Sequence, residues 1–195
     1  SISSLGEPIA IYSSSKSLIE KVEATQISPG ESQGRLPDGA NNIVKFPTTT
    51  SPGKPNYKPI ESIVINEVLT HTDPPYEDAI ELLNLSGNPL NIGNWWISNS
   101  ESYLTKFQIP NGTIIQPRGT LAFYEGQFNT NQDTDKSFAL NSSQGDKVIL
   151  SATDSNGKLT GYRIPIEFEA AENGFSFGRI KTSLGDQFVT LARPT

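Results

Sequence analysis

Ser32-Gln33-Gly34-Arg35 and Ser176-Phe177-Gly178-Arg179 are two copies of the pattern Ser-x-Gly-Arg, placed 144 residues apart in a chain of 195. Each copy is followed by turn residues and then by an exit rich in Thr and Pro. Similarity between two distant parts of one chain is stronger evidence for its domain organisation than any local pattern. The motif therefore predicts a structural unit that occurs twice, and its arginines are better candidates for structural clamps than for catalysts.

The similarity extends beyond the motif on both sides. Upstream, residues 5–11 match residues 144–150 at an offset of 139, and downstream residues 35–51 match residues 179–195 at an offset of 144. The change of offset indicates a five-residue insertion in the hairpin of the second copy. Residues 1–57 are therefore predicted to be a second version of the end of the chain.

This repeat predicts two domains of unequal completeness. Residues 1–57 would be the C-terminal half of one domain, ending in a Pro-rich linker, and residues 58–195 a complete second domain. The second part is long enough to bury a core of its own. The chain contains no Met, even at position 1, which is expected of a chain that begins inside a longer precursor or after a processed signal.

Short apolar runs separated by turn residues predict an all-β chain with little helix. Residues 79–85 could also be read as a helix, but Ser86-Gly87-Asn88-Pro89 ends the run too early for a helix of normal length, so a strand is predicted. Closely spaced turn signals favour an antiparallel β-sandwich. The predicted strands include residues 8–12, 18–22, 43–46, 62–68, 79–85, 95–97, 106–109, 113–115 and 120–124.

Six motifs, in this order along the chain, resemble the successive signatures of the lamin tail domain family. They are Ile65–Val68, Asp78–Leu85, Asn91–Ser98, Phe107–Thr113, Asn173–Arg179 and Ala192–Thr195. The resemblance implies an immunoglobulin-like β-sandwich, with residues 1–57 as the rear half of a preceding copy. It also implies a module of a secreted or envelope bacterial protein, because bacterial members are often repeated beside hydrolase, nuclease or spore-coat-kinase-like domains. Nothing resembles the rod of nuclear lamins, so filament formation is not implied.

Composition limits the classes of partner. Lys and Arg number 15 against 21 Asp and Glu, so the clustered positive charge that phosphate backbones require is missing, and no nucleic acid is expected as a partner. No apolar run is long enough for a membrane span. The absence of Cys excludes disulfides and thiolate metal sites. Abundant Ser, Thr, Asn, Gly and Pro are typical of secreted β-rich modules, which favours an extracellular or cell-envelope location.

Acidic residues in two loops are the candidates for a metal site. Asp73, Glu77 and Asp78 lie within one Pro-containing loop, where a hard cation such as calcium could collect oxygen ligands. The alternative is a solvated acidic loop without a metal, and this alternative is favoured, so no cofactor is expected. A second stretch alternates like the start of a calcium loop but lacks the Gly and the final Glu; its residues are Asn129, Asn131, Asp133 and Asp135.

No residue is predicted to be catalytic. His71 is the only histidine, so a Ser-His-Asp arrangement would depend on it, yet no Gly-x-Ser-x-Gly turn occurs and an exposed loop residue is favoured. Glu67 and Glu81 could form a glycosidase-type pair, but a structural role is preferred. Arg179 is predicted to act as a clamp that ties the rear half of the domain to the strand carrying Glu81.

Trp95 and Trp96 are the candidates for ligand contact. Adjacent residues of a strand face opposite sides, so one ring should enter the core and leave the other free. With Tyr103 or Tyr124, an exposed ring could stack on a sugar or on a partner protein. The alternative is burial of that second ring under a loop or under the neighbouring half-domain.

The sequence thus predicts a non-catalytic interaction, adhesion or spacer module of a larger extracellular or envelope bacterial protein. One alternative is an accessory module that binds glycan or nucleic acid for a secreted hydrolase or nuclease, and another is a calcium-dependent binding domain. The expected partners are other domains of the same protein and a protein or glycan surface. Because residues 1–57 would leave strand edges open, this half is expected either to pack on the second domain or to exchange strands with another molecule in a homo-oligomer.

Overall fold

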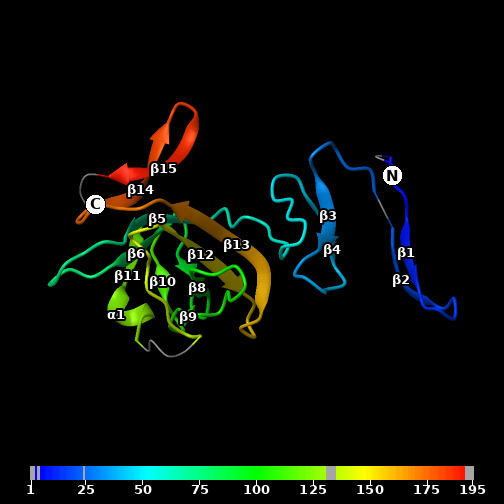
Figure 1. Ribbon diagram of the computed structural model, residues 1–195, viewed down its shortest axis with the longest axis horizontal. Coiled ribbons are helices and arrows are strands. Elements are labelled where there is room, and N and C mark those ends of the chain that lie inside the picture. Colours follow the sequence, from blue (N-terminus) through cyan, green and yellow to red (C-terminus); the bar gives the residue numbers. More distant parts are fainter. Residues whose placement is uncertain (1–2, 4, 24, 131–134, 192–195) are drawn as a thin grey trace. The chain divides into compact units, whose positions relative to one another are not determined.

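The computed structural model describes residues 3, 5–23, 25–130 and 135–191 and divides the chain into two compact units (Figure 1). Unit 1 comprises residues 1–58 and unit 2 comprises residues 59–195, with the division inside the Pro-rich segment. Strands dominate both units. In the described residues the one helix is α1 (Glu125–Phe128), and no described helix is long and apolar enough to cross a membrane.

Unit 2 is an antiparallel sandwich built from two main sheets. The first sheet has the order β11-β6-β5-β14-β15 and the second the order β13-β12-β8-β9, with a small β10-β7 pair beside them. The strands of the first sheet are β5 (Ile63–Leu69), β6 (Ala79–Asn84), β11 (Thr120–Tyr124), β14 (Ser176–Thr182) and β15 (Gly185–Leu191). The remaining strands are β7 (Leu90–Asn91), β8 (Trp96–Ser98), β9 (Phe107–Gln108), β10 (Ile114–Ile115), β12 (Asp146–Thr153) and β13 (Leu159–Phe168). Residues 79–84 therefore form a strand, as predicted.

One apolar core lies between these sheets. Ile65 of β5 and Leu82 of β6 come from the first sheet, and Ile97 of β8 and Leu150 of β12 from the second, and all four are fully buried. Phe128 of α1 joins them and stacks on Phe138, with ring centroids 4.9 Å apart. Contributions from both sheets to one cluster confirm the predicted all-β sandwich, because each sheet buries one face against the other.

A bulge in β5 places Glu67 opposite Glu81 and brings Asn66 within hydrogen-bond distance of Glu81. The register between β5 and β6 shifts between Ile65 and Glu67, so Asn66 is an extra residue, and Glu67 lies directly opposite Glu81. Asn66 Nδ2 donates a 2.6 Å hydrogen bond to Glu81 Oε1. Glu67 is buried, whereas Glu81 is half-buried. The bulge therefore gives Glu81 an amide partner from the neighbouring strand.

Unit 1 consists of two hairpins. β1 (Ile9–Tyr12) pairs with β2 (Leu18–Val22), and β3 (Ser32–Arg35) pairs with β4 (Ile43–Phe46), each as a two-stranded sheet. Arg35 of β3 forms an ion pair with Glu20 of β2 and donates a hydrogen bond to the carbonyl oxygen of Ala40. The first Ser-x-Gly-Arg arginine thus links the two hairpins.

The two hairpins of unit 1 have the same strand pairing as the last four strands of unit 2. In β1–β2, Ile9 lies opposite Val22; in β12–β13, Val148 lies opposite Ile166. These pairs correspond through the offsets of 139 and 144 found in the sequence. The registers therefore place the five-residue insertion in the loop of the β12–β13 hairpin.

The second hairpin requires one adjustment to the sequence alignment. Gly34 lies opposite Val44, whereas Gly178 lies opposite Val189, which corresponds to an offset of 145 in the returning strand. The uniform offset of 144 downstream of the motif is therefore wrong within this hairpin, because eight residues separate Arg179 from its partner Phe188, whereas seven separate Arg35 from its partner Ile43. The matched residues 192–195 lie outside the described residues.

Candidate binding site

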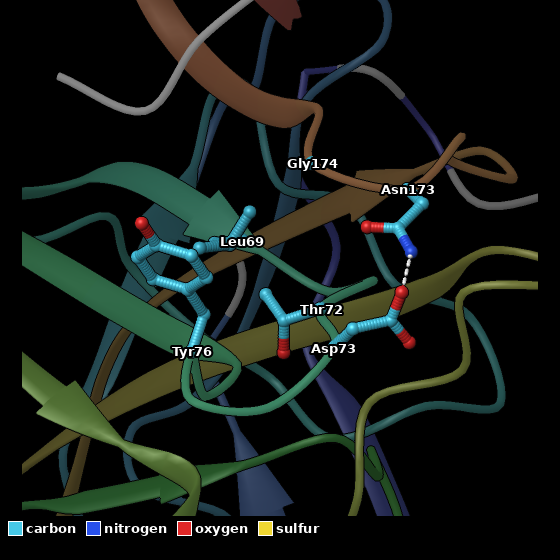
Figure 2. Close-up of a pocket in the computed structure, with 6 residues that line it drawn as sticks. All are labelled: Leu69, Thr72, Asp73, Tyr76, Asn173 and Gly174. Atoms are coloured by element: carbon cyan, nitrogen blue, oxygen red, sulfur yellow. Dashed lines mark hydrogen bonds between the residues drawn. The ribbon is translucent and has the colours of Figure 1, made fainter.

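A loop of unit 2 that joins β5 to β6, residues 70–78, is held against a second loop that joins β13 to β14. His71 Nδ1 donates to the carbonyl oxygen of Ala171 over 2.9 Å, and the Gly174 amide donates to the carbonyl oxygen of His71 over 2.9 Å. The Asn173 amide nitrogen also donates to the carboxylate of Asp73 (Figure 2). His71 is thus half-buried and hydrogen-bonded, so the expectation of an exposed loop residue is wrong.

The opposite side of the same loop is fixed by the start of α1. The amide of Gly126 donates to Glu77 Oε2 over 2.9 Å, and the amide of Glu125 donates to the carbonyl oxygen of Asp78 over 2.8 Å. Within the loop, the amide of Tyr76 donates to the carbonyl oxygen of Asp73 over 3.0 Å. A Pro-rich connection of this length is therefore anchored on both sides by backbone hydrogen bonds.

Between the anchored loops lies a cavity of about 260 Å³, named here the loop pocket. Its lining residues come from both loops and from the end of β5: Leu69, Thr72, Asp73, Tyr76, Asn173 and Gly174 (Figure 2). The Tyr76 side chain is 75% exposed, although its backbone is held in place. The loop pocket thus combines an aromatic ring and an aliphatic side chain with a hydroxyl, a carboxylate and an amide.

Asp78 lies behind the loop pocket and has an altered acidity. Thr72 Oγ1 donates a 3.0 Å hydrogen bond to its Oδ1, and the residue is only 8% exposed. Burial raises the pKa of Asp78 from 3.8 to about 6, and the charge of Glu125 adds to the rise. The hydrogen bond from Thr72 and the nearby His71 act in the opposite direction. Asp78 can therefore take up a proton in mildly acidic solution, close to Thr72 of the loop pocket.

The three carboxylates considered for calcium have three different hydrogen-bond partners. Asp73 accepts from Asn173, Glu77 from the Gly126 amide and Asp78 from Thr72. Within the described part of the chain, no group of three or more acidic or histidine side chains is arranged to hold a metal ion. The structure thus does not bring Asp73, Glu77 and Asp78 together as one set of ligands.

The second acidic stretch is described only in part. Asn129 ends α1, and its amide nitrogen donates to Glu125 Oε1 over 2.8 Å. Asn131 and Asp133 lie outside the described residues, and Asp135 is exposed. Asn129 therefore serves the end of the helix.

Arg179 forms its ion pair with Asp186 of β15, not with Glu81 as predicted. The Arg179 Nη1 to Asp186 Oδ2 distance is 3.9 Å. β5 lies between β14 and β6, so Arg179 and Glu81 are two strands apart, about 10 Å in the hydrogen-bonding direction. The predicted pair does not form, and each residue instead has a partner on an adjacent strand.

Trp95 and Trp96 are both half-buried. Trp95 packs against the core, and Trp96 lies in β8, opposite Ser151 of β12. By contrast, Tyr103 is 58% and Tyr124 52% exposed. The exposed aromatic ring beside a pocket belongs to Tyr76.

Sequence reasoning missed Tyr76 and Asn173 as partners in one site. Asp73 and Asn173 are 100 residues apart in the chain and meet only because β14 pairs with β5. Pro74-Pro75 marked residues 70–78 as an irregular loop, and Asn173-Gly174 marked a turn. Those turn signals were present, but the contact between the two loops depends on the sheet order.

Fold and site together define an antiparallel β-sandwich module whose connecting loops carry a pocket. The family model described as Lamin Tail Domain matches residues 57–163, more than half of the chain. The chain therefore belongs to the lamin tail domain family, whose fold is immunoglobulin-like. No curated protein and no solved structure matches the chain significantly.

Proposed function

We propose that unit 2 is a non-catalytic interaction module of a larger extracellular or cell-envelope bacterial protein, and that it binds its ligand at the loop pocket. The family supports an interaction role without catalysis, since lamin tail domains are generally non-enzymatic. The ligand is a surface group on a protein or glycan, which docks on the aromatic side of the pocket and is oriented by the polar side.

The observation that carries this proposal is the exposed ring of Tyr76 on an anchored loop. Tyrosine offers a large amphipathic contact area and loses little side-chain freedom on binding. Its loop is hydrogen-bonded on one side to residues 171–174 and on the other to α1, so little ordering is required when a ligand binds. These two properties together are typical of an anchor residue in a recognition site.

Accessory glycan binding is a second candidate, supported by the polar side of the loop pocket. Asp73 Oδ2 accepts from Asn173, and within the described residues Asp73 Oδ1 is not engaged in a hydrogen bond. A carboxylate and an amide beside an aromatic ring suit a sugar, because the ring stacks on the apolar face while oxygen and nitrogen atoms bond to hydroxyl groups. The same geometry suits a polar peptide turn.

Binding of the labelled intact chain to purified bacterial cell envelopes tests the proposal. We expect saturable binding that Tyr76→Ala lowers at least tenfold, since an aromatic anchor contributes about 2 kcal/mol or more. Tyr103→Ala is the matched control, because it also removes an exposed ring, but from outside the loop pocket. The control should bind like the unaltered chain.

Treating the envelopes with protease separates the two kinds of ligand. Loss of binding after proteolysis identifies a protein surface, and binding that survives proteolysis but is inhibited by free sugars identifies a glycan. The proposal is wrong if Tyr76→Ala binds as tightly as the unaltered chain, or if the chain does not bind to envelopes at all.

A further inference from the structure

The first hairpin of unit 1 exposes residues whose counterparts in unit 2 are buried. Ile9 and Ile11 of β1 are 48% and 57% exposed, whereas the matching Val148 and Leu150 of β12 are fully buried in the sandwich core. The strands correspond in register as well as in sequence, since Ile9 opposite Val22 matches Val148 opposite Ile166. The same positions are thus apolar in both units and covered in only one.

The strand edges of the two units also differ, because edges that are paired in unit 2 are open in unit 1. In unit 2, β8 pairs with the outer edge of β12, and β5 pairs with the outer edge of β14. The counterparts of β12 and β14 are β1 and β3, and each of these pairs only with its own hairpin partner among the described residues. An open strand edge presents unpaired N–H and C=O groups in a row and favours the addition of another strand. Unit 1 therefore has two open edges where unit 2 has β8 and β5.

The exposed surface is confined to the first hairpin. Phe46 of β4 is 1% exposed and Leu36 is 5% exposed, so the second hairpin buries its own large side chains within unit 1. The ion pair between Arg35 and Glu20 links the second hairpin to the first. Within unit 1, Phe46 and Leu36 are thus buried, while most of the apolar side chains of β1–β2 stay exposed.

We infer that unit 1 binds a polypeptide segment built like residues 59–143 of this chain, and that the two together form a second sandwich. The segment supplies one strand equivalent to β8 for the edge of β1 and one equivalent to β5 for the edge of β3. Its apolar side chains, equivalent to Ile65 and Ile97, cover Ile9 and Ile11. This inference concerns unit 1 and does not depend on the loop pocket of unit 2.

A second copy of the same chain does not fit this surface. The edges of β5 and β8 that would be needed are already paired with β14 and β12 in each copy. To cover β1–β2, a second copy would have to release its own rear half and expose Val148 and Leu150. The partner is instead a front-half segment that lacks its own rear half.

Two chains test this inference by amide hydrogen exchange and sedimentation. The first is the unaltered chain; the second is extended by a duplicate of residues 59–143 joined directly to Leu5, the position that matches Gln144. We expect the unaltered chain to be a monomer with fast exchange in residues 9–12 and 18–22. In the extended chain these amides should exchange at least about tenfold more slowly.

A matched control carries Ile9→Asp and Ile11→Asp in the extended chain. We expect it to exchange in β1–β2 as fast as the unaltered chain, while residues 146–153 of unit 2 stay protected in both. Equal exchange of β1–β2 in the extended and unaltered chains would overturn the inference. The unaltered chain also tests it alone: slow exchange of β1–β2 in a monomer would mean that its own residues cover the hairpin, and a stable dimer would mean that a second copy does.

Discussion

Leu191 of β15 packs directly against Gly178 of β14, so closely that a Cβ atom on the glycine would overlap Leu191 Cδ1. In the first copy, a Cβ on Gly34 would lie 2.9 Å from the amide nitrogen of Asn56 and in ordinary contact, at 3.4 Å, with the ring of Phe46. Phe46 and Leu191 are equivalent in register, two residues beyond the partner of the glycine. Glycine is therefore favoured in both copies of Ser-x-Gly-Arg because a side chain packs close to it, Leu191 in the second copy and Asn56 in the first.

Gly178→Ala should lower the free energy of unfolding of unit 2 by about 1–3 kcal/mol, the usual effect of overpacking. The added methyl group meets Leu191 Cδ1, so the Leu191 side chain must move to make room. Urea denaturation followed by tryptophan fluorescence measures this change. Gly87→Ala is the matched control, because a Cβ at Gly87 meets nothing within 4 Å, and its effect should stay within about 0.5 kcal/mol. A similar effect from both substitutions would contradict the packing argument.

Asn84 at the end of β6 is a buried hydrogen-bonding centre that the sequence did not reveal. Its Nδ2 donates to the carbonyl oxygens of Asn88, Ile115 and Gln116 at 2.8, 3.1 and 3.1 Å, with one of its two hydrogens shared between two acceptors, and its Oδ1 accepts from Ser86. Asn84 is fully buried. The side chain therefore ties the β6–β7 turn to the end of β10.

Asn84→Ala should destabilise unit 2 by roughly 2–4 kcal/mol, because it leaves buried carbonyl groups without donors and also creates a small cavity. Asn84→Asp keeps the shape but replaces the amide donor by an acceptor, so its effect should be at least as large at neutral pH. Thermal unfolding of the two variants measures both changes. If Asn84→Asp were as stable as the unaltered chain, the hydrogen bonds donated by Asn84 Nδ2 could not contribute as the geometry indicates.

Local sequence patterns were sufficient to predict the strands, but not the contacts between residues that are far apart in the chain. β-Branched runs such as Ile63–Leu69 and the turn residues around Asn156-Gly157 identify strands and hairpins because their signals are local. The internal repeat went further, because its offsets of 139 and 144 are reproduced by the registers of β1–β2 and β12–β13. A repeat carries tertiary information that no single motif contains.

The contacts of the candidate site residues could not be predicted from the sequence. Arg179 and Glu81 have complementary charges, but their distance depends on the order of strands, which places β5 between them. Likewise, Asp73 and Asn173 become neighbours only through the pairing of β5 with β14. A sequence gives charge and local conformation at each position, whereas the order of strands in a sheet emerges from the packing of the whole core.

Asp78 should make the stability of unit 2 depend on pH between about 4 and 6. Its folded pKa of about 6 exceeds the ordinary value of 3.8, so the folded state binds more protons than the unfolded state in this interval. The free energy of unfolding therefore falls as pH rises through the interval, and the stability present below pH 4 is lost progressively up to pH 6. Urea denaturation at several pH values follows this loss.

Asp78→Asn should remove that dependence and stabilise unit 2 at pH 7 by roughly 1–3 kcal/mol, because a neutral amide avoids the buried charge and still accepts from Thr72. Glu169→Gln removes one negative charge from an exposed position and serves as the matched control. The control should keep the slope of the unaltered chain. An equal slope in Asp78→Asn would assign the pH dependence to other groups.

Arg179→Ala should lower the free energy of unfolding by about 1 kcal/mol, mostly through loss of packing along the aliphatic part of its side chain. The Arg179 side chain is 22% exposed and that of Asp186 is 43% exposed, so their ion pair is partly screened by water. Asp186→Ala should therefore have a smaller effect than Arg179→Ala, below about 0.5 kcal/mol. A double-mutant cycle in low and high salt separates the coupling of the pair from the packing, because only the coupling weakens with salt. An unchanged melting temperature in Arg179→Ala would exclude a structural role for this arginine, and a coupling above about 2 kcal/mol would mean that the ion pair itself holds β14 and β15 together.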